Sequence, residues 1–166
     1  MLSALKFLVV DDQPFTREIV STILKSASAT HIDYASDGAG ALERIRLSMP
    51  DIVITDQLMA GMEGIDLIRL IRSSSDSPNP FLPIIMLTGR TDEAFVAEAR
   101  DAGMTEFASK PITAANLFSR INACILRPRQ FVRKENYFGP DRRRRLNPDY
   151  PGKKRRTAYL IPHALD

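Results

Sequence analysis

Short apolar runs alternate with amphipathic stretches along residues 1–126, and no other feature of the chain constrains its fold as strongly. The apolar runs, which we expect to form strands, are 5–10, 31–35, 51–55, 83–87 and 106–109. The stretches between them carry apolar residues at the spacing of a helix, and a last helix is expected over residues 113–126. Because nearly continuous apolar strands need cover on both faces, these five strand–helix units predict a parallel sheet with helices on each side.

Individual residues indicate where some of these helices begin and end. Pro14 suits the first position of a helix, along which Phe15 and Leu24 keep helical spacing with other apolar residues. Gly103 is placed to end the helix that precedes the fifth strand, because glycine readily adopts the left-handed conformation that follows a helix.

Polar residues stand at the points where the expected strands stop. They are Asp11 and Asp12 after the first strand, Asp56 after the third, Thr88 after the fourth and Lys110 after the fifth. The carboxyl ends of parallel strands meet at one edge of a sheet, which is where open sheets bind their ligands. We therefore expect these side chains to share one crevice.

The residue types in this crevice favour phosphoryl transfer. Three neighbouring carboxylates repel one another unless a cation is present, and hard oxygen ligands completed by water suit Mg²⁺. A lysine and a hydroxyl stabilise a phosphoryl group during transfer, and a carboxylate can itself be the nucleophile. Hydrolysis of a sugar or a peptide would need an acid of raised pKa or a histidine base, and neither is visible. The pattern predicts phosphoryl transfer onto an aspartate.

Four motifs make the chain resemble a known family. They are Val9–Asp12, Asp56–Gly64, Leu87–Gly89 and Phe107–Pro111. In this order and at these separations they resemble the receiver domain of bacterial two-component response regulators (CheY-like), over residues 4–126. The resemblance implies a doubly wound, flavodoxin-like α/β fold with strand order 2-1-3-4-5. Ala60 stands where the family usually has proline. The alanine leaves the loop after Asp56 looser but removes no ligand.

The resemblance also implies a metal site. Asp56 would accept the phosphoryl group, and Mg²⁺ would be held by Asp56, by Asp12 directly and by Asp11 largely through water. The backbone carbonyl of Leu58 would fill a further position. Leu58 and Arg90 occupy positions that tend in this family to govern the rate of dephosphorylation.

The remaining motif residues are implied to respond to phosphorylation. Lys110 would pair with the phosphoryl oxygens, and the peptide bond from Lys110 to Pro111 would be cis. Thr88 would turn its hydroxyl toward the phosphoryl group, while Phe107 would turn inward as the switch aromatic. This local change of charge would alter the face formed by the fourth helix, the fifth strand and the fifth helix.

The expected function is that of a response regulator in a two-component phosphorelay. Asp56 would receive its phosphoryl group from a sensor histidine kinase or a histidine phosphotransfer protein, and the altered face would contact a downstream protein target. A homodimer through that face is common in the family. We do not expect an enzyme with a free substrate, because such a domain catalyses only its own phosphorylation and slow dephosphorylation.

The net charge of the chain changes sign near residue 126, where the resemblance to the receiver family ends. Residues 1–126 hold 11 Lys and Arg against 16 Asp and Glu, a net −5, whereas residues 127–166 hold 12 against 4, a net +8. Prolines argue against a long helix in residues 127–166, so we expect an irregular basic extension without a recognisable output domain. Aromatic residues lie among its two basic clusters, Arg142–Arg145 and Lys153–Arg156.

Three interpretations of this extension stay open. It could be a solvated or semi-ordered extension that folds back on the acidic domain or on a second copy, it could be a docking peptide for a protein partner, or it could bind nucleic acid. The last gives the alternative function, a receiver-regulated nucleic-acid-binding protein, because arginine clusters neutralise phosphates and aromatic rings stack on bases.

Composition excludes several other classes of protein. No run approaches the roughly 18–20 apolar residues that span a bilayer, and no signal peptide is visible, so we expect a cytoplasmic protein without membrane contact. The single cysteine, Cys124, excludes an internal disulfide and is expected in the core. His31 and His163 have no partner at metal-ligand spacing and are interpreted as structural or surface residues.

Overall fold

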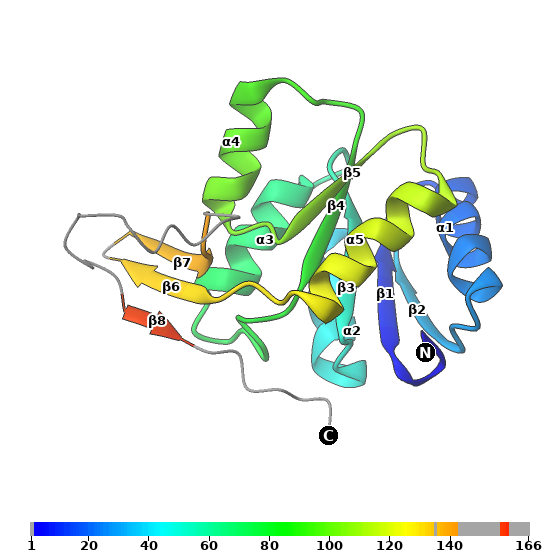
Figure 1. Cartoon of the computed structure of the whole chain (residues 1–166), viewed down its shortest axis with the longest axis horizontal. Helices are drawn as coiled ribbons and strands as arrows, with labels where there is room; N and C mark the ends of the chain where they lie inside the picture. Colours follow the sequence, from blue (N-terminus) through cyan, green and yellow to red (C-terminus); the bar gives the residue numbers. More distant parts are fainter. Residues whose placement is uncertain (1, 135, 143–156, 160–166) are drawn as a thin grey trace.

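A parallel sheet of five strands forms the centre of the protein, and a computed structural model describes residues 2–134, 136–142 and 157–159. The strand order is β2-β1-β3-β4-β5, as the resemblance implied. The strands are β1 (Lys6–Val10), β2 (His31–Ala35), β3 (Ile52–Asp56), β4 (Ile84–Thr88) and β5 (Glu106–Ser109). Each begins and ends within one residue of the range predicted from the apolar runs, so those runs are confirmed as strands (Figure 1).

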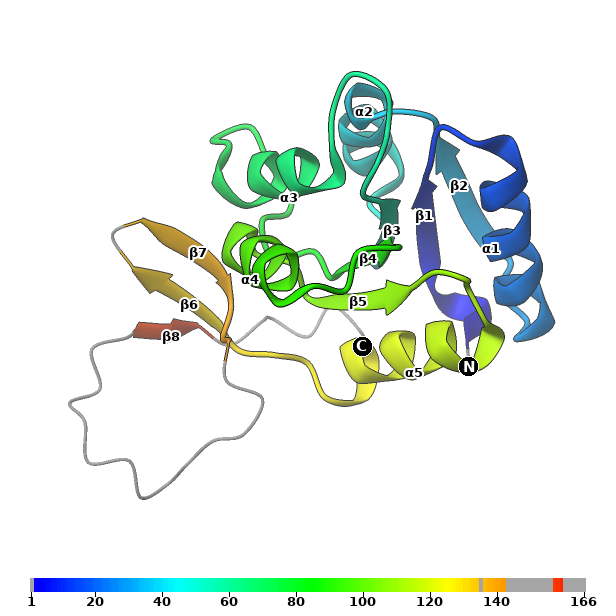
Figure 2. The ribbon, with the colours of Figure 1, turned by 90° about the horizontal axis from the view of Figure 1, so that it is seen from above.

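Helices cover both faces of this sheet. They are α1 (Pro14–Ser26), α2 (Gly38–Ser48), α3 (Gly64–Ser73), α4 (Glu93–Ala102) and α5 (Ala114–Leu126), with a 3-10 turn, η1 (Leu2–Ala4), before β1. The view from above shows α1 and α5 on one face and α2, α3 and α4 on the other (Figure 2). Side chains alternate between the two cores along each inner strand: Val9 packs with α1 and α5, whereas Leu8 packs with α2 and α3. Cys124 is buried in the first of these cores, as predicted.

The helix ends follow the local chemistry of the sequence. Pro14 stands at the start of α1, and Gly103 ends α4 in the left-handed conformation, with φ of 105°. Asp92 begins α4 by accepting a hydrogen bond from the amide of Phe95 at 3.0 Å. Phe15, which keeps helical spacing with other apolar residues of α1, is nevertheless 73% exposed near the start of that helix.

The described part of the C-terminal extension contains three short strands. Strands β6 (Phe131–Lys134) and β7 (Tyr137–Pro140) form an antiparallel hairpin, and β8 (Thr157–Tyr159) pairs with the other edge of β6. The hairpin lies beside α3 and the C-terminal end of α4 (Figures 1 and 2). Apart from Arg142, both basic clusters lie outside the described residues, as does His163.

An aromatic cluster attaches the hairpin to the domain. The ring of Phe131 is only 1% exposed and packs against Phe81 and Phe138, with centroids 5.2 and 5.6 Å away. Pairs of aromatic rings at such separations stabilise a fold beyond the area that they bury. Residues 127–134 and 136–142 therefore fold back on the receiver, as the first of the three interpretations allowed.

A buried arginine lies beneath this cluster. The guanidinium of Arg72, near the end of α3, donates hydrogen bonds to the carbonyl oxygens of Gly103 at 3.0 Å and Pro80 at 2.9 Å, and it lies 5.1 Å from the ring of Phe131. Burial lowers the pKa of Arg72 to about 9, which leaves the group charged at neutral pH. Its hydrogen bonds and the aromatic ring compensate part of the cost of burying that charge.

The described part of the chain contains no helix that is both long and apolar enough to cross a membrane.

Candidate functional site

The ends of four strands place the predicted polar residues at one edge of the sheet. Asp11 follows β1, Asp56 and Thr88 are the last residues of β3 and β4, and Lys110 follows β5. The register is parallel throughout, so that Asp56 lies beside Leu87. The structure therefore brings these residues to a common edge, as their positions in the sequence predicted.

Asp56 is a buried carboxylate with a cation beside it. Its side chain is 3% exposed, and its Oδ1 accepts a hydrogen bond from the amide of Gln57 and forms an ion pair with Nζ of Lys110, both at 2.8 Å. Within the described residues, no hydrogen bond to Oδ2 is formed. A carboxylate held through one oxygen keeps the other available for reaction.

The loop after Asp56 is fixed by two residues that the sequence analysis did not single out. Gln57 is buried, and its side chain accepts a hydrogen bond from the amide of Ile65 at 3.2 Å and donates one to Glu63 at 2.9 Å. Gly64 allows α3 to approach β3, because a Cβ atom there would lie 2.3 Å from the carbonyl oxygen of Asp56. The available signal for Gln57 was its position directly after Asp56 within the motif Asp56–Gly64.

Asp11 and Asp12 lie next to this site and are incompletely hydrogen-bonded. Asp11 Oδ1 accepts a bond from the amide of Gln13 at 2.8 Å, and Asp12 Oδ2 accepts one from the amide of Ala60 at 3.2 Å. The other oxygen of each carboxylate is buried without a hydrogen-bond partner among the described residues. Burial raises the pKa of Asp11, and the nearby charge of Asp56 adds to this effect.

These unpaired oxygens test whether the site fits a metal ion. No group of three or more metal-binding side chains within the described residues is arranged to enclose an ion. Mg²⁺, however, keeps several waters and often takes only one or two carboxylates from a protein. Two buried oxygens without partners, beside a third carboxylate, fit such a hydrated ion. The part predicted for the Leu58 carbonyl stays a prediction, because no contact of that carbonyl is defined.

Thr88 contacts the loop that leads into α4. Its hydroxyl accepts a hydrogen bond from the amide of Arg90 at 2.9 Å and donates one to the Arg90 carbonyl at 3.3 Å. The guanidinium of Arg90 lies 3.3 Å from Asp92 and 4.6 Å from the centre of the Phe95 ring. These contacts direct Arg90 toward the first turn of α4.

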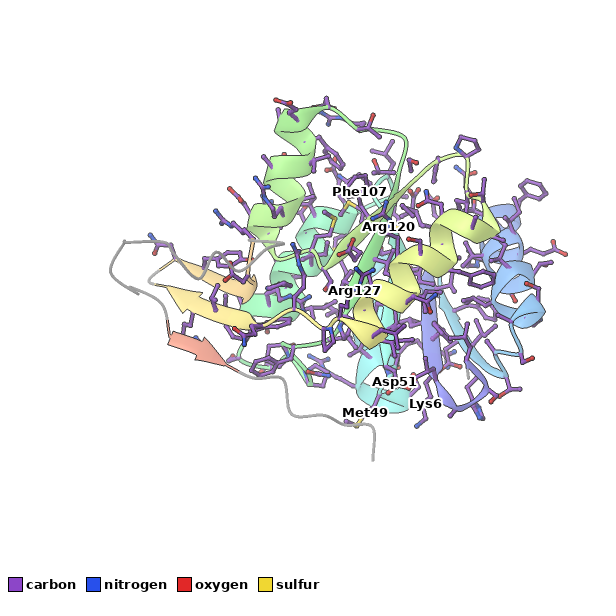
Figure 3. All side chains as sticks on the ribbon, viewed as in Figure 1. Lys6, Met49, Asp51, Phe107, Arg120 and Arg127 are labelled. Atoms are coloured by element: carbon purple, nitrogen blue, oxygen red, sulfur yellow. The ribbon has the colours of Figure 1, made fainter. Side chains whose placement is uncertain are left out.

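Phe107 lies between α4 and α5 on strand β5 (Figure 3). It is half-buried against the core beneath α3 and α4, and the guanidinium of Arg120 lies 5.6 Å from its ring. Arg120 in turn forms an ion pair with Glu106 at 3.5 Å. The peptide bond between Lys110 and Pro111 is cis, as predicted.

The fold and this set of residues define a class of protein. A parallel sheet of order 2-1-3-4-5, with acidic residues, a threonine and a lysine at its carboxyl edge, is that of the receiver-type α/β domains. The sequence model of the response regulator receiver domain matches residues 7–122, and the chain belongs to this family. It contains the receiver domain of a response regulator in two-component signalling.

Individual relatives agree with this assignment. The chemotaxis protein CheY-3 of Vibrio cholerae is 35% identical over 118 residues, which cover 71% of this chain and 89% of the relative. The DNA-binding response regulator MtrA of Mycolicibacterium smegmatis is 34% identical over 124 residues, 74% of this chain but only 51% of that protein. Only the region shared with MtrA is compared, so its name says nothing of the extension here.

Solved structures give the same result. The chemotaxis protein CheY4 of Vibrio cholerae superimposes with a TM-score of 0.65 at 30% identity, covering 71% of this chain and 96% of the other. A signal receiver domain of a histidine kinase from Syntrophus aciditrophicus gives a TM-score of 0.66 at 28% identity, covering 74% and 91%.

Proposed function

We propose that Asp56 is the phosphoacceptor of this response regulator and that it receives its phosphoryl group from a sensor histidine kinase or a histidine phosphotransfer protein. The observation that carries this proposal is the buried Asp56 carboxylate, held at 2.8 Å by Lys110 through one oxygen only. An ion pair that served only for stability would not need two further carboxylates beside it, because they raise the cost of burying the charge.

The chemistry is a single displacement at phosphorus. The Asp56 oxygen that Lys110 does not hold attacks the phosphorus of a phosphohistidine, and an oxygen–phosphorus bond forms as the phosphorus–nitrogen bond breaks. The electron pair of that bond passes to the imidazole nitrogen, and a ring protonated on its other nitrogen leaves as neutral histidine. The product on this chain is an acyl phosphate at Asp56.

Positive charge around the phosphoryl oxygens lowers the barrier to this transfer. Lys110 supplies one charge, and its side chain is already placed at the Asp56 carboxylate. A bound Mg²⁺ would supply the remaining charge, held by Asp11, Asp12 and Asp56 together with the Leu58 carbonyl. Without that ion the three carboxylates repel one another and would also repel an incoming phosphoryl group.

The signal then passes through the face of α4, β5 and α5. The Thr88 hydroxyl exchanges its bonds with Arg90 for one to the phosphoryl group, and Phe107 moves inward from its half-buried position. We propose that a downstream protein target, or a second copy of the chain, contacts this face. The chain has no free substrate and acts as a switch that slowly loses its own phosphoryl group.

Intact-mass spectrometry after incubation with acetyl phosphate and Mg²⁺ tests this proposal. A single phosphoryl adduct is expected for the wild type and for the exposed control Asp76→Asn, and none for Asp56→Asn. An equal adduct on Asp56→Asn would refute the assignment of Asp56. Folding of each variant is checked by circular dichroism, so that a lost adduct is not confused with a lost fold.

The alternative, nucleic-acid binding through the extension, depends on two basic clusters that lie mostly outside the described residues. It predicts DNA binding that falls steeply with salt and disappears when residues 143–166 are removed. Binding that persists after this truncation, or that does not depend on salt, would contradict the alternative.

A further inference from the structure

A small pocket lies where the extension meets α4 and β5. Its volume is about 150 Å³. The polar and aromatic residues that line it include Arg100, Thr105, Glu106, Phe107, Arg129 and Arg142. It is separate from the Asp56 site, because Thr105 precedes β5 and Glu106 begins it, whereas Lys110 follows its end.

Three arginines give this pocket a positive character. Arg100 comes from the last turn of α4, whereas Arg129 and Arg142 come from the extension. The single carboxylate in the lining, Glu106, already forms an ion pair with Arg120 of α5. The pocket therefore combines charges from two parts of the chain that are far apart in the sequence.

Arg129 is fixed at the pocket by a backbone contact. Its Nη1 donates a hydrogen bond to the carbonyl oxygen of Thr105 at 3.1 Å, which ties the extension to the start of β5. A guanidinium has five N–H donors, so this one bond leaves others for a ligand. The hydrogen bond to Thr105 therefore holds the Arg129 guanidinium at the pocket before any ligand binds.

Arg142 has contacts that an anion could replace at low cost. Its Nη1 lies 3.1 Å from Asp101, but the two side chains are 37% and 53% exposed, so the pair contributes little to stability. Its Nε is buried without a hydrogen-bond partner among the described residues. The guanidinium also lies 4.4 Å from the centre of the Tyr137 ring, which supports it from β7. A reorientation toward a bound anion would break no hydrogen bond at Nε.

We propose that this pocket binds a single oxyanion, either a phosphate or a carboxylate, and that the extension completes it by supplying Arg129 and Arg142. Guanidinium groups bind such anions through charged hydrogen bonds that are stronger than neutral ones. The size of the pocket supports one anionic group rather than a larger ligand, because pockets for drug-sized molecules have volumes of about 300 Å³ or more.

The position of Phe107 in the lining connects this pocket to the proposed switch. If phosphorylation of Asp56 moves Phe107, the affinity of the pocket for an anion changes with it. By linkage, the bound anion then changes the affinity of the Asp56 site for its own ligands by the same factor. This step rests on the proposed function, whereas anion binding itself does not.

Nuclear magnetic resonance of the ¹⁵N-labelled full chain tests the proposal. Sodium phosphate and sodium acetate are titrated separately, with chloride used to keep the ionic strength constant. We expect saturable shifts at the amides of residues 104–107 and at the arginine Nε–H groups. Tenfold tighter saturation by phosphate would assign a phosphoryl ligand, and tighter saturation by acetate would assign a carboxylate. Comparable affinities would support a general oxyanion site.

Three variants make the result specific. Loss of one charged hydrogen bond lowers affinity by about tenfold, and less where solvent screens it, so Arg129→Gln and Arg142→Gln should each weaken binding by about three- to tenfold. Arg127→Gln, which removes an exposed arginine outside the lining, should change it less than about twofold. Absence of saturable shifts, or equal weakening by all three variants, would refute the proposal that this pocket binds an anion.

Coupling to the switch is tested on the same samples. Beryllofluoride, a phosphoryl analogue, is added with Mg²⁺, and the phosphate titration is repeated. A changed affinity supports coupling. An unchanged affinity, with beryllofluoride shifts visible around Asp56, overturns the coupling but leaves the pocket. If no shifts appear around Asp56, the proposed phosphoacceptor has failed, and this result is distinct from failure of the pocket.

Discussion

Replacing Phe131 with alanine should destabilise the whole receiver and not only the extension. The ring is 1% exposed, has two aromatic neighbours within 5.6 Å and covers the buried guanidinium of Arg72. Phenylalanine-to-alanine changes in cores cost about 3–5 kcal/mol. Because a hairpin at the periphery can relax into the space, we expect the lower end, about 3 kcal/mol. Urea unfolding followed by far-ultraviolet circular dichroism measures this loss.

The matched control is Phe15→Ala. This variant removes the same atoms from a ring that is 73% exposed on α1, so its cost should stay within about 0.5 kcal/mol. A loss within about 0.5 kcal/mol for Phe131→Ala, as for a surface change, would show that the hairpin only rests on the surface. The burial of Arg72 would then have to be stabilised by its hydrogen bonds alone.

Further predictions concern the site and the core. Mg²⁺ should raise the melting temperature of the wild type and raise that of Asp12→Asn less, because the ion neutralises carboxylates that repel one another; equal shifts in a thermal scan would contradict this. Lys110→Gln should slow phosphorylation by acetyl phosphate by about a hundredfold, since one preorganised charge is lost. A mass-spectrometric time course that matched the wild type would refute that role. Burial raises the pKa of Cys124 from 9.0 to about 12, so its thiol should react with Ellman's reagent at pH 8 only in urea. Between pH 9 and 12 the unfolded chain releases a proton that the folded one keeps, so stability should fall as the pH rises. Rapid reaction of the native protein with Ellman's reagent would contradict the burial of the Cys124 thiol.

Much of the fold could be predicted because its strands are apolar almost throughout. A strand buried on both faces leaves a continuous run in the sequence, and the polar residue that ends the run marks the edge of the sheet. Asp56 and Lys110 could be placed at one edge in this way, although more than fifty residues separate them. Their contact at 2.8 Å depends also on the strand order, which places β4 between β3 and β5 and which the family resemblance implied.

The hairpin could not be predicted in the same way, because its stability depends on distant partners. Phe131 and Phe138 stand among arginines, lysines and prolines, which is typical of a solvated segment. Their packing requires Phe81 and Arg72, and nothing in the helical pattern of residues 64–73 distinguishes Arg72 from an exposed arginine. Phe15 shows that helical spacing alone does not locate the buried face, because its ring in the first turn of α1 lies in solvent.

Helix α4 runs from the loop beside Thr88 to the C-terminal extension, and its length determines how far a tilt at one end moves the other end. Its first turn begins beside Arg90, which holds the Thr88 hydroxyl, and its last turn carries Asp101, which holds Arg142. Ten residues of helix span about 15 Å. A tilt of about 4° at the first turn would therefore displace the last turn by about 1 Å, which is enough to break a hydrogen bond. A rearrangement of the two hydrogen bonds at Thr88 that tilted α4 would therefore displace Asp101 and alter its contact with Arg142 of the extension.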